Sequence, residues 1–304
     1  MSLRALVLDG VLRRAVAHGH GAGVPVEIER RRREGGPAPA PIPQRVSSRF
    51  AVTETVVQGS RVMRLGNSSR RRPRAMVFLP GGGYAQPISA SHWRTVARLA
   101  RAAGIDAIVP LYEVAPAGDA ERAHRFVSEV LGQAVSEYGR GDVVLAGDSA
   151  GAGLALAVLQ RHPDEAAAAV LLNPWLDVEI SHPAAAVLED WDVILRSDGL
   201  RKWGKAWAGS LSTSDPAVSP IHGRFDDLPP VHLITGARDL LMPDALDAHR
   251  LLRAAGNRGT LTYAPDANHA VGHLGSATPE GRRAQNAIVA VLAGAAPIEG
   301  NPAP

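Results

Sequence analysis

Short continuous apolar runs alternate with amphipathic stretches along most of this chain. Ala75–Leu79 and Ala168–Leu172 are apolar throughout, whereas Asp119–Tyr138 repeats its apolar positions every three to four residues, as a helix with one buried face does. Strands buried on both faces are apolar throughout, and their alternation with helices is typical of parallel sheets. The pattern therefore predicts an α/β fold, with a mostly parallel central sheet and helices on both faces.

The expected elements follow one another from about residue 50. An antiparallel pair of strands, Val52–Gln58 and Arg61–Leu65, is expected around a turn at Gly59-Ser60. The later strands are expected at Ala75–Leu79, Ile105–Val109, Asp142–Gly147, Ala168–Leu172, Val231–Thr235 and Gly259–Tyr263. The helices are expected at Ser91–Ala103, Asp119–Tyr138, Ala150–Arg161, Pro243–Ala255 and Pro279–Ala293.

Two segments do not fit this alternation. Residues 1–45 begin with a short helical stretch, Leu3–Ala17, and end near the proline-rich Pro37–Pro43, which can be neither helix nor central strand. Residues 178–212 stand between two strands and hold three of the five tryptophans. We expect three parts: residues 1–45 form an N-terminal arm and part of a helical cap, residues 178–212 form a cap insertion, and residues 46–177 with 213–304 form the core.

The aromatic residues of the insertion indicate a lid over a pocket. Trp191 and Trp207, together with Tyr84 from the core, are the residues expected to line that pocket. An extra helix packed on the sheet would explain any one of these tryptophans equally well.

The absence of cysteine excludes several kinds of chemistry. It removes disulfides, thiolate zinc sites and cysteine nucleophiles, and the histidines show no spacing with carboxylates that would form a metal site. Asp9 interrupts the first apolar run, and no stretch approaches the roughly 18 apolar residues of a membrane-spanning helix. We therefore expect a soluble cytoplasmic protein with no stable membrane insertion.

Charge is distributed unevenly, although the net charge is only +3. Residues 1–74 hold 15 basic and 5 acidic residues, largely because of the runs Arg30–Arg33 and Arg70–Arg72. Such runs suit a patch for nucleic acid or anionic lipid, or they are solvated loops in an arginine-rich chain. No aromatic residues interleave them, as they would in a single-strand binder. We therefore favour solvated loops and predict no nucleic-acid partner.

Gly147-Asp148-Ser149-Ala150-Gly151 has the pattern G-x-S-x-G between an apolar strand and a helix. A sharp strand-to-helix turn strains the backbone at the serine, and the two glycines remove side chains that would clash there. The turn exposes the Ser149 hydroxyl at the carboxyl edge of the sheet, beside a helix N-terminus that favours negative charge. Ser149 is therefore the candidate nucleophile, although a glycine-rich packing turn has the same pattern.

A serine hydroxyl needs a base to take its proton. Asp239 follows the strand Val231–Thr235, and His269 follows the strand Gly259–Tyr263. Nucleophile, acid and base thus come in the chain order of an α/β-hydrolase and fall on one edge of a parallel sheet. We expect these three side chains to form a catalytic triad.

Neighbouring residues offer alternatives to this assignment. His273 is a rival base four residues further on; we favour His269 because it lies nearer the end of the strand. Asp244 and Asp247 lie in the next helix and are expected to be surface charges.

Pro80-Gly81-Gly82-Gly83 follows the strand Ala75–Leu79. In an α/β-hydrolase a loop at this place supplies an oxyanion-hole amide, together with the amide of the residue after the nucleophile, here Ala150. A phosphate-binding loop is the alternative, but the lysine, the threonine and the glycine spacing of such loops are absent.

Taken together, these motifs resemble the bacterial hormone-sensitive lipase family of α/β-hydrolases over about residues 75–290. The resemblance lies in the segments Pro80–Tyr84, Leu111–Pro116, Gly147–Gly151, Asn173–Asp177 and Asp215–Pro220. It implies an esterase of small to medium acyl esters that needs no cofactor, with Gly81 and Gly82 as the amide donors of the loop. It also implies a cap built from residues 1–45 and 178–212, and it allows a homodimer.

Three positions depart from the family pattern. Pro80 replaces a histidine that braces the loop by hydrogen bonding, Glu113 replaces an arginine, and Asn268-His269-Ala270 stands where the family has His-Gly-Phe. These changes bear on efficiency and substrate range more than on the type of reaction.

The leading hypothesis is hydrolysis of carboxylic esters through an acyl-enzyme on Ser149, with His269 as the base and Asp239 as its partner. An amidase, deacetylase or lactonase would use the same triad, and the fold does not separate these activities. A small-molecule binding protein is the third hypothesis. Relatives that lose catalysis typically lose the base, whereas here both His269 and Asp239 are present.

Overall fold

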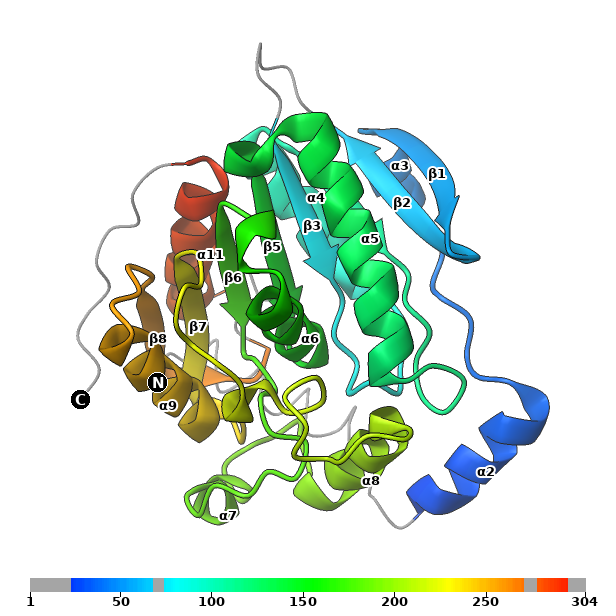
Figure 1. Ribbon diagram of the computed structural model, residues 1–304, viewed down its shortest axis with the longest axis vertical. Helices are drawn as coiled ribbons and strands as arrows, with labels where there is room; N and C mark the ends of the chain where they lie inside the picture. Colours follow the sequence, from blue (N-terminus) through cyan, green and yellow to red (C-terminus); the bar gives the residue numbers. More distant parts are fainter. Residues whose placement is uncertain (1–22, 68–73, 271–277, 295–304) are drawn as a thin grey trace.

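The central sheet organises the whole molecule (Figure 1). The computed structural model describes residues 23–67, 74–270 and 278–294. Within them, eight strands form one sheet in the order β1-β2-β4-β3-β5-β6-β7-β8. The first two strands, β1 (Ala51–Val57) and β2 (Ser60–Gly66), form the expected antiparallel pair, and β2 is also antiparallel to β4 (Asp106–Pro110).

The other neighbours in the sheet are parallel. These strands are β3 (Ala75–Leu79), β5 (Val143–Asp148), β6 (Ala168–Leu172), β7 (Val231–Arg238) and β8 (Leu261–Asn268). Every residue of β3, β5 and β6 is buried, as their continuous apolar sequences require. The expected α/β fold with a mostly parallel sheet is therefore confirmed.

Helices cover both faces of the sheet (Figure 1). One face carries α5 (Ala120–Tyr138), α6 (Ala150–Arg161) and α9 (Met242–Ala254), and the other carries α4 (Ala90–Ala103) and α11 (Pro279–Leu292). Alternate residues of β3 point into the two resulting hydrophobic layers: Val77 and Leu79 into the first, Met76 and Phe78 into the second. Short 3₁₀ turns occupy Arg140–Asp142, Pro163–Glu165 and Pro220–His222.

The N-terminal arm contains a helix that the sequence did not lead us to expect. Arg30–Arg33 lies in α2 (Val24–Glu34) and not in a solvated loop. Arg31 is buried; it donates to Glu27 at 2.6 Å and to the carbonyl of Ala85, and its guanidinium lies 4.7 Å from the ring centroid of Trp203. Ala85 and Trp203 are far from Arg31 in the sequence, so the arginine run by itself did not predict these two contacts.

The arm and the insertion contact each other through Arg31 and Trp203. Helix α2 lies against α8 (Ser197–Ala208), the longer helix of the insertion, and two one-turn helices, α3 (Gln44–Ser47) and α7 (Ala185–Leu188), complete the two segments. The division into arm, core and cap insertion stays a prediction. The expected helix Leu3–Ala17 and the run Arg70–Arg72 lie outside the described residues. Among the helices that the structure describes, none is long and apolar enough to cross a bilayer.

Candidate active site

The turn between β5 and α6 holds Ser149 in a strained conformation. Its φ of 53° and ψ of −121° lie in a region that residues with a side chain rarely adopt. The amide of Ser149 donates to the carbonyl of Leu172 at 2.8 Å, which fixes the turn to β6. A Cβ on Gly147 would lie 2.5 Å from the carbonyl oxygen of Gly151, so glycine is required at this contact. The strained turn expected from the G-x-S-x-G pattern is therefore present.

Two neighbouring strands bring Asp239 and His269 to Ser149. Strand β7 ends at Arg238 and β8 ends at Asn268, so Asp239 and His269 are each the first residue after a strand. His269 Nε2 lies 2.9 Å from Ser149 Oγ, and His269 Nδ1 lies 3.0 Å from Asp239 Oδ1. These distances are those of two consecutive hydrogen bonds. The rival base, His273, lies outside the described residues.

Asp239 is held rigidly behind the imidazole. Its side chain is fully buried, and it accepts the amide of Leu241 at 3.0 Å and the side-chain amide of Asn173 at 2.6 Å. Asn173 directly follows β6 and has a φ of 45°. No role was predicted for Asn173. The available signal was its position at the end of β6, between the strands that precede Ser149 and Asp239.

Nearby carboxylates change the pKa of His269. Burial by itself lowers the pKa of His269, but Asp239, and then Asp192 and Asp148, raise it to about 9. The imidazolium is therefore strongly stabilised in this site, and Asp239 accepts its Nδ1 proton. Such an imidazole readily takes the proton of a serine hydroxyl as that serine attacks a carbonyl.

The glycine loop is braced by two groups. The amide of Gly81 donates to Asp148 Oδ1 at 2.9 Å, and the hydroxyl of Tyr112 donates to the carbonyl of Pro80 at 2.5 Å. Asp148 in turn contacts His92 Nε2 from α4, at 3.3 Å. The loop thus has braces although Pro80 stands where a histidine was expected. The expectation that the Gly81 amide faces the oxyanion is corrected, because the carboxylate preceding Ser149 takes that amide.

Three other amides remain for an oxyanion. Those of Gly82, Gly83 and Ala150 donate to no acceptor within the part of the chain that the structure describes. Gly82 and Gly83 have φ values of 132° and 62°, which a residue with a side chain rarely adopts. Ala150 opens α6, where the amides of a first helical turn are unsatisfied by the helix itself.

Two of the three aromatic residues expected to line a pocket are buried in the core. Tyr84 and Trp207 are buried, and their rings stack with centroids 4.1 Å apart and planes 3° apart. Trp175 stacks on Tyr84 with centroids 5.4 Å apart, and Tyr112 meets the edge of Trp207. This cluster attaches α8 to the glycine loop and forms core, not an accessible wall. Trp191 is 59% exposed.

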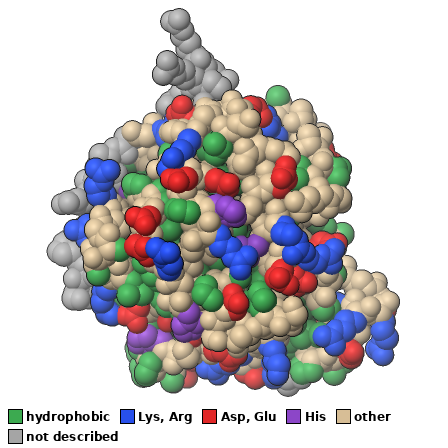
Figure 2. Space-filling view, viewed as in Figure 1, with side chains coloured by type: hydrophobic (Ala, Val, Ile, Leu, Met, Phe, Trp, Pro, Cys, Tyr) green, Lys and Arg blue, Asp and Glu red, His purple; other side chains and the backbone are tan. Residues whose placement is uncertain are grey.

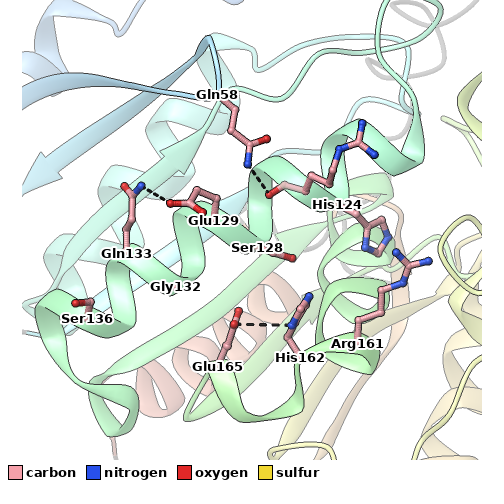
Figure 3. Close-up of a pocket in the computed structure, with 11 residues that line it drawn as sticks. Gln58, His124, Ser128, Glu129, Gly132, Gln133, Ser136, Arg161, His162 and Glu165 are labelled. Atoms are coloured by element: carbon pink, nitrogen blue, oxygen red, sulfur yellow. Dashed lines mark hydrogen bonds and ion pairs between the residues drawn. The ribbon is translucent and has the colours of Figure 1, made fainter.

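The outer face of α5 and α6 shows a separate hollow. It has a volume of about 570 Å³ and is lined by residues that include His124, Glu129, Arg161 and Glu165 (Figure 3). None of its lining residues belongs to the Ser149 site. Figure 2 shows acidic and basic side chains interspersed over this face of the molecule, without one basic patch.

Comparison with known proteins agrees with the α/β-hydrolase fold. A family model for the α/β-hydrolase fold matches residues 76–273. An acetyl-hydrolase from Streptomyces hygroscopicus is 31% identical over 227 residues, which are 71% of this chain and 74% of that relative. A triacylglycerol lipase from Mycobacterium tuberculosis is 31% identical over 176 residues, which are 56% of this chain but only 36% of that lipase.

Solved structures share the same architecture. An esterase from the bacterial hormone-sensitive lipase family superposes with a TM-score of 0.81 at 22% identity, over 97% of this chain and 98% of that one. The esterase EstE5, soaked with p-nitrophenyl butyrate, gives a TM-score of 0.79 at 22% identity, over 97% of this chain and 99% of its own. At this level of identity the likeness concerns the fold alone.

Proposed function

Because this chain belongs to the α/β-hydrolase family, we propose that it is a serine carboxylesterase that cleaves small to medium acyl esters through an acyl-enzyme. The observation that carries the proposal is the unbroken chain of hydrogen bonds from Ser149 Oγ through His269 to Asp239. The names of its relatives, an acetyl-hydrolase and a triacylglycerol lipase, support the reaction class, and the acetyl-hydrolase favours a short acyl group.

Each step of the reaction has a group in position. Ser149 Oγ attacks the ester carbonyl while His269 Nε2 takes the hydroxyl proton, and Asp239 stabilises the imidazolium that forms. The amides of Gly82, Gly83 and Ala150 bind the negative oxygen of the tetrahedral intermediate. His269 then returns its proton to the leaving alkoxide. A water molecule, deprotonated by His269, then attacks the acyl-enzyme. The bond from the acyl carbon to Ser149 Oγ breaks, His269 returns its proton to Oγ, and the carboxylic acid leaves.

Ser149→Ala tests the nucleophile. Without the hydroxyl no acyl-enzyme forms, so turnover of p-nitrophenyl butyrate should fall by about 10⁴-fold or more. A fluorophosphonate probe should label the wild type and not the variant. Ser210→Ala is the matched control, because Ser210 is an exposed serine whose hydroxyl contacts only Glu121, at 3.4 Å, in the described structure. Turnover and labelling near the wild-type level in Ser149→Ala would refute the proposed function.

The base is tested in the same assay. His269→Ala should lose activity to a similar extent, while His273→Ala should keep most of it. The reverse result would transfer the role of base to His273. A matched p-nitroanilide substrate separates an esterase from an amidase, since both would depend on Ser149.

A further inference from the structure

A second buried carboxylate lies beside the triad. Asp192 belongs to residues 178–212, and its side chain is fully buried. Its Oδ1 accepts the amides of Ile194 and Leu195 at 2.7 and 2.9 Å, and its Oδ2 accepts the amide of Leu240 at 2.8 Å. The first two bonds close a turn inside the insertion. The third leaves the insertion and reaches the loop after β7.

This third bond joins the insertion to the loop that carries Asp239. Leu240 directly follows Asp239, and the amide of Leu241 donates to Asp239 Oδ1 at 3.0 Å. Consecutive amides of one turn thus bind two carboxylates, one at the sheet edge and one on the insertion. Any shift of Asp192 would move the turn that orients Asp239.

The charges around Asp192 and His269 also affect the pKa values of these two residues. Burial raises the pKa of Asp192, and the charge of Asp239 adds to this, whereas His269 and the bound amides oppose it. The effect on His269 is reciprocal: burial lowers its pKa, and Asp239, Asp192 and Asp148 together raise it. The imidazole therefore responds to a carboxylate on the insertion as well as to the one that it contacts.

The other charged groups around Asp192 do not neutralise it. The guanidinium of Arg196 donates to the backbone carbonyls of Asp192 and Leu195. Glu189 binds the amide and the hydroxyl of Ser197 at the start of α8. The positive charge of His269, together with the amides of Leu240 and Leu195, stabilises the ionised Asp192.

We propose that Asp192 is a positioning residue of the triad, through which the insertion controls the base. Its carboxylate fixes the Asp239 loop through the Leu240 amide, and its negative charge stabilises the His269 imidazolium that forms when Ser149 attacks. The inference rests on the proposed esterase function. An insertion displaced from the sheet would take this charge away, so His269 is fully basic only with the insertion in place.

Asp192→Asn tests the charge at nearly constant volume. In the wild type the pKa of His269 is raised to about 9, so kcat/KM for p-nitrophenyl butyrate should rise with pH up to that range. Removing a nearby negative charge lowers the pKa of an imidazole, so the rising limb should move about one unit to lower pH. At high pH, kcat should fall about tenfold, because asparagine has one acceptor oxygen where Asp192 uses two, so the Leu240 amide and the turn of Ile194 are no longer both held. Titration of the His269 imidazole by NMR in the free enzyme should show the same shift.

Asp177→Asn is the matched control. Asp177, directly before the insertion, is 2% exposed and accepts the amides of Glu179 and Ser181 within it. It thus has the same kind of local role without a bond to the Asp239 loop. Its variant should lose stability while its pH limb coincides with that of the wild type.

Each outcome of these measurements bears on one claim. A folded Asp192→Asn enzyme whose rate limb and imidazole titration match the wild type would overturn the role of Asp192, while Ser149-dependent turnover would leave the esterase proposal standing. If Asp192→Asn does not fold, Asp192→Ser removes the same charge, keeps an oxygen as acceptor, and is judged by the same two titrations.

Discussion

The carboxyl edge of the sheet and the insertion beside it support the same site by different means. At the sheet edge, strand register and close backbone contacts place Ser149, Asp239 and His269 directly after β5, β7 and β8. In the insertion, buried carboxylates bind the amides of turns, and one aromatic ring, that of Trp207, stacks in the core. The sheet edge therefore holds the site through backbone hydrogen bonds and close backbone packing, whereas the insertion holds it through single side chains.

This difference predicts how each region fails. A side chain added at the sheet edge must push two backbones apart, so the reacting atoms themselves are displaced. A side chain removed from the insertion leaves the sheet in place and takes away packing or charge. Variants of the two regions should therefore separate loss of activity in a folded protein from loss of stability.

Trp207→Ala should have the largest effect on stability. The ring is fully buried and stacks on Tyr84, whose neighbours form the glycine loop. Removing a buried ring of this size costs about 3–5 kcal/mol, measurable as the free energy of unfolding in urea. Trp191→Ala is the control, because Trp191 is 59% exposed, and its variant should stay within about 0.5 kcal/mol of the wild type. Equal losses in the two variants would contradict the buried position of Trp207.

Gly151→Ala should act mainly on catalysis. The added Cβ would lie 2.1 Å from the carbonyl oxygen of Leu79, so α6 and β3 must separate. Ser149 then moves relative to the glycine loop, and a displacement of about 1 Å costs on the order of 100-fold in kcat/KM, equivalent to about 2.7 kcal/mol. Gly132→Ala in α5 is the control, since an added Cβ there meets nothing within 4 Å. It should stay fully active and gain about 0.5–1 kcal/mol of stability.

The two regions also differ in how far the sequence predicts them. The bounds of β6 and α6 agree with the apolar runs, because strands buried on both faces and a buried helix carry an unmistakable pattern. Strands β7 and β8 continue to Arg238 and Asn268, beyond the expected ends at Thr235 and Tyr263. Their last residues are polar and pair across an irregular register, so hydrophobicity does not mark them.

Side chains held by distant partners escaped prediction. The guanidinium of Arg31 can be buried because it donates to the carbonyl of Ala85 and lies over the ring of Trp203. The carboxylate of Asp192 can be buried because it accepts the amide of Leu240. Neither residue differs from a surface charge in its local sequence. The hydrogen-bonded arrangement of Ser149, His269 and Asp239 was predictable, in contrast, because each of the three follows a strand in a known chain order.

The smallest of these effects is expected at Asp244. This residue lies in α9, and its pKa responds to the charge of Asp177, directly before the insertion. It was expected at the surface, but it is 6% exposed in α9, and burial, with the charges of Asp177 and Asp247, raises its pKa to about 7. The folded state therefore binds this proton more tightly than the unfolded state, whose carboxyl has the ordinary value of 3.8. Its contribution to stability is complete below about pH 4 and is lost as pH rises towards 7.

Asp244→Asn should remove this pH dependence. At about pH 3.5 the variant and the wild type should unfold at similar urea concentrations, because the carboxyl is neutral in both the folded and the unfolded wild type. At pH 8 the variant should be more stable than the wild type by about 2 kcal/mol. A shift of three pKa units represents about 4 kcal/mol, but within the described residues the buried amide of the asparagine has no partner either, and this cost offsets part of the gain. Asp226→Asn is the control: Asp226 pairs with Arg224 at the surface, its pKa is lowered, and no stabilisation at pH 8 should follow. If the difference in stability between wild type and Asp244→Asn is the same at about pH 3.5 and at pH 8, the Asp244 carboxyl titrates normally, and the charge of Asp177, directly before the insertion, has no effect on α9.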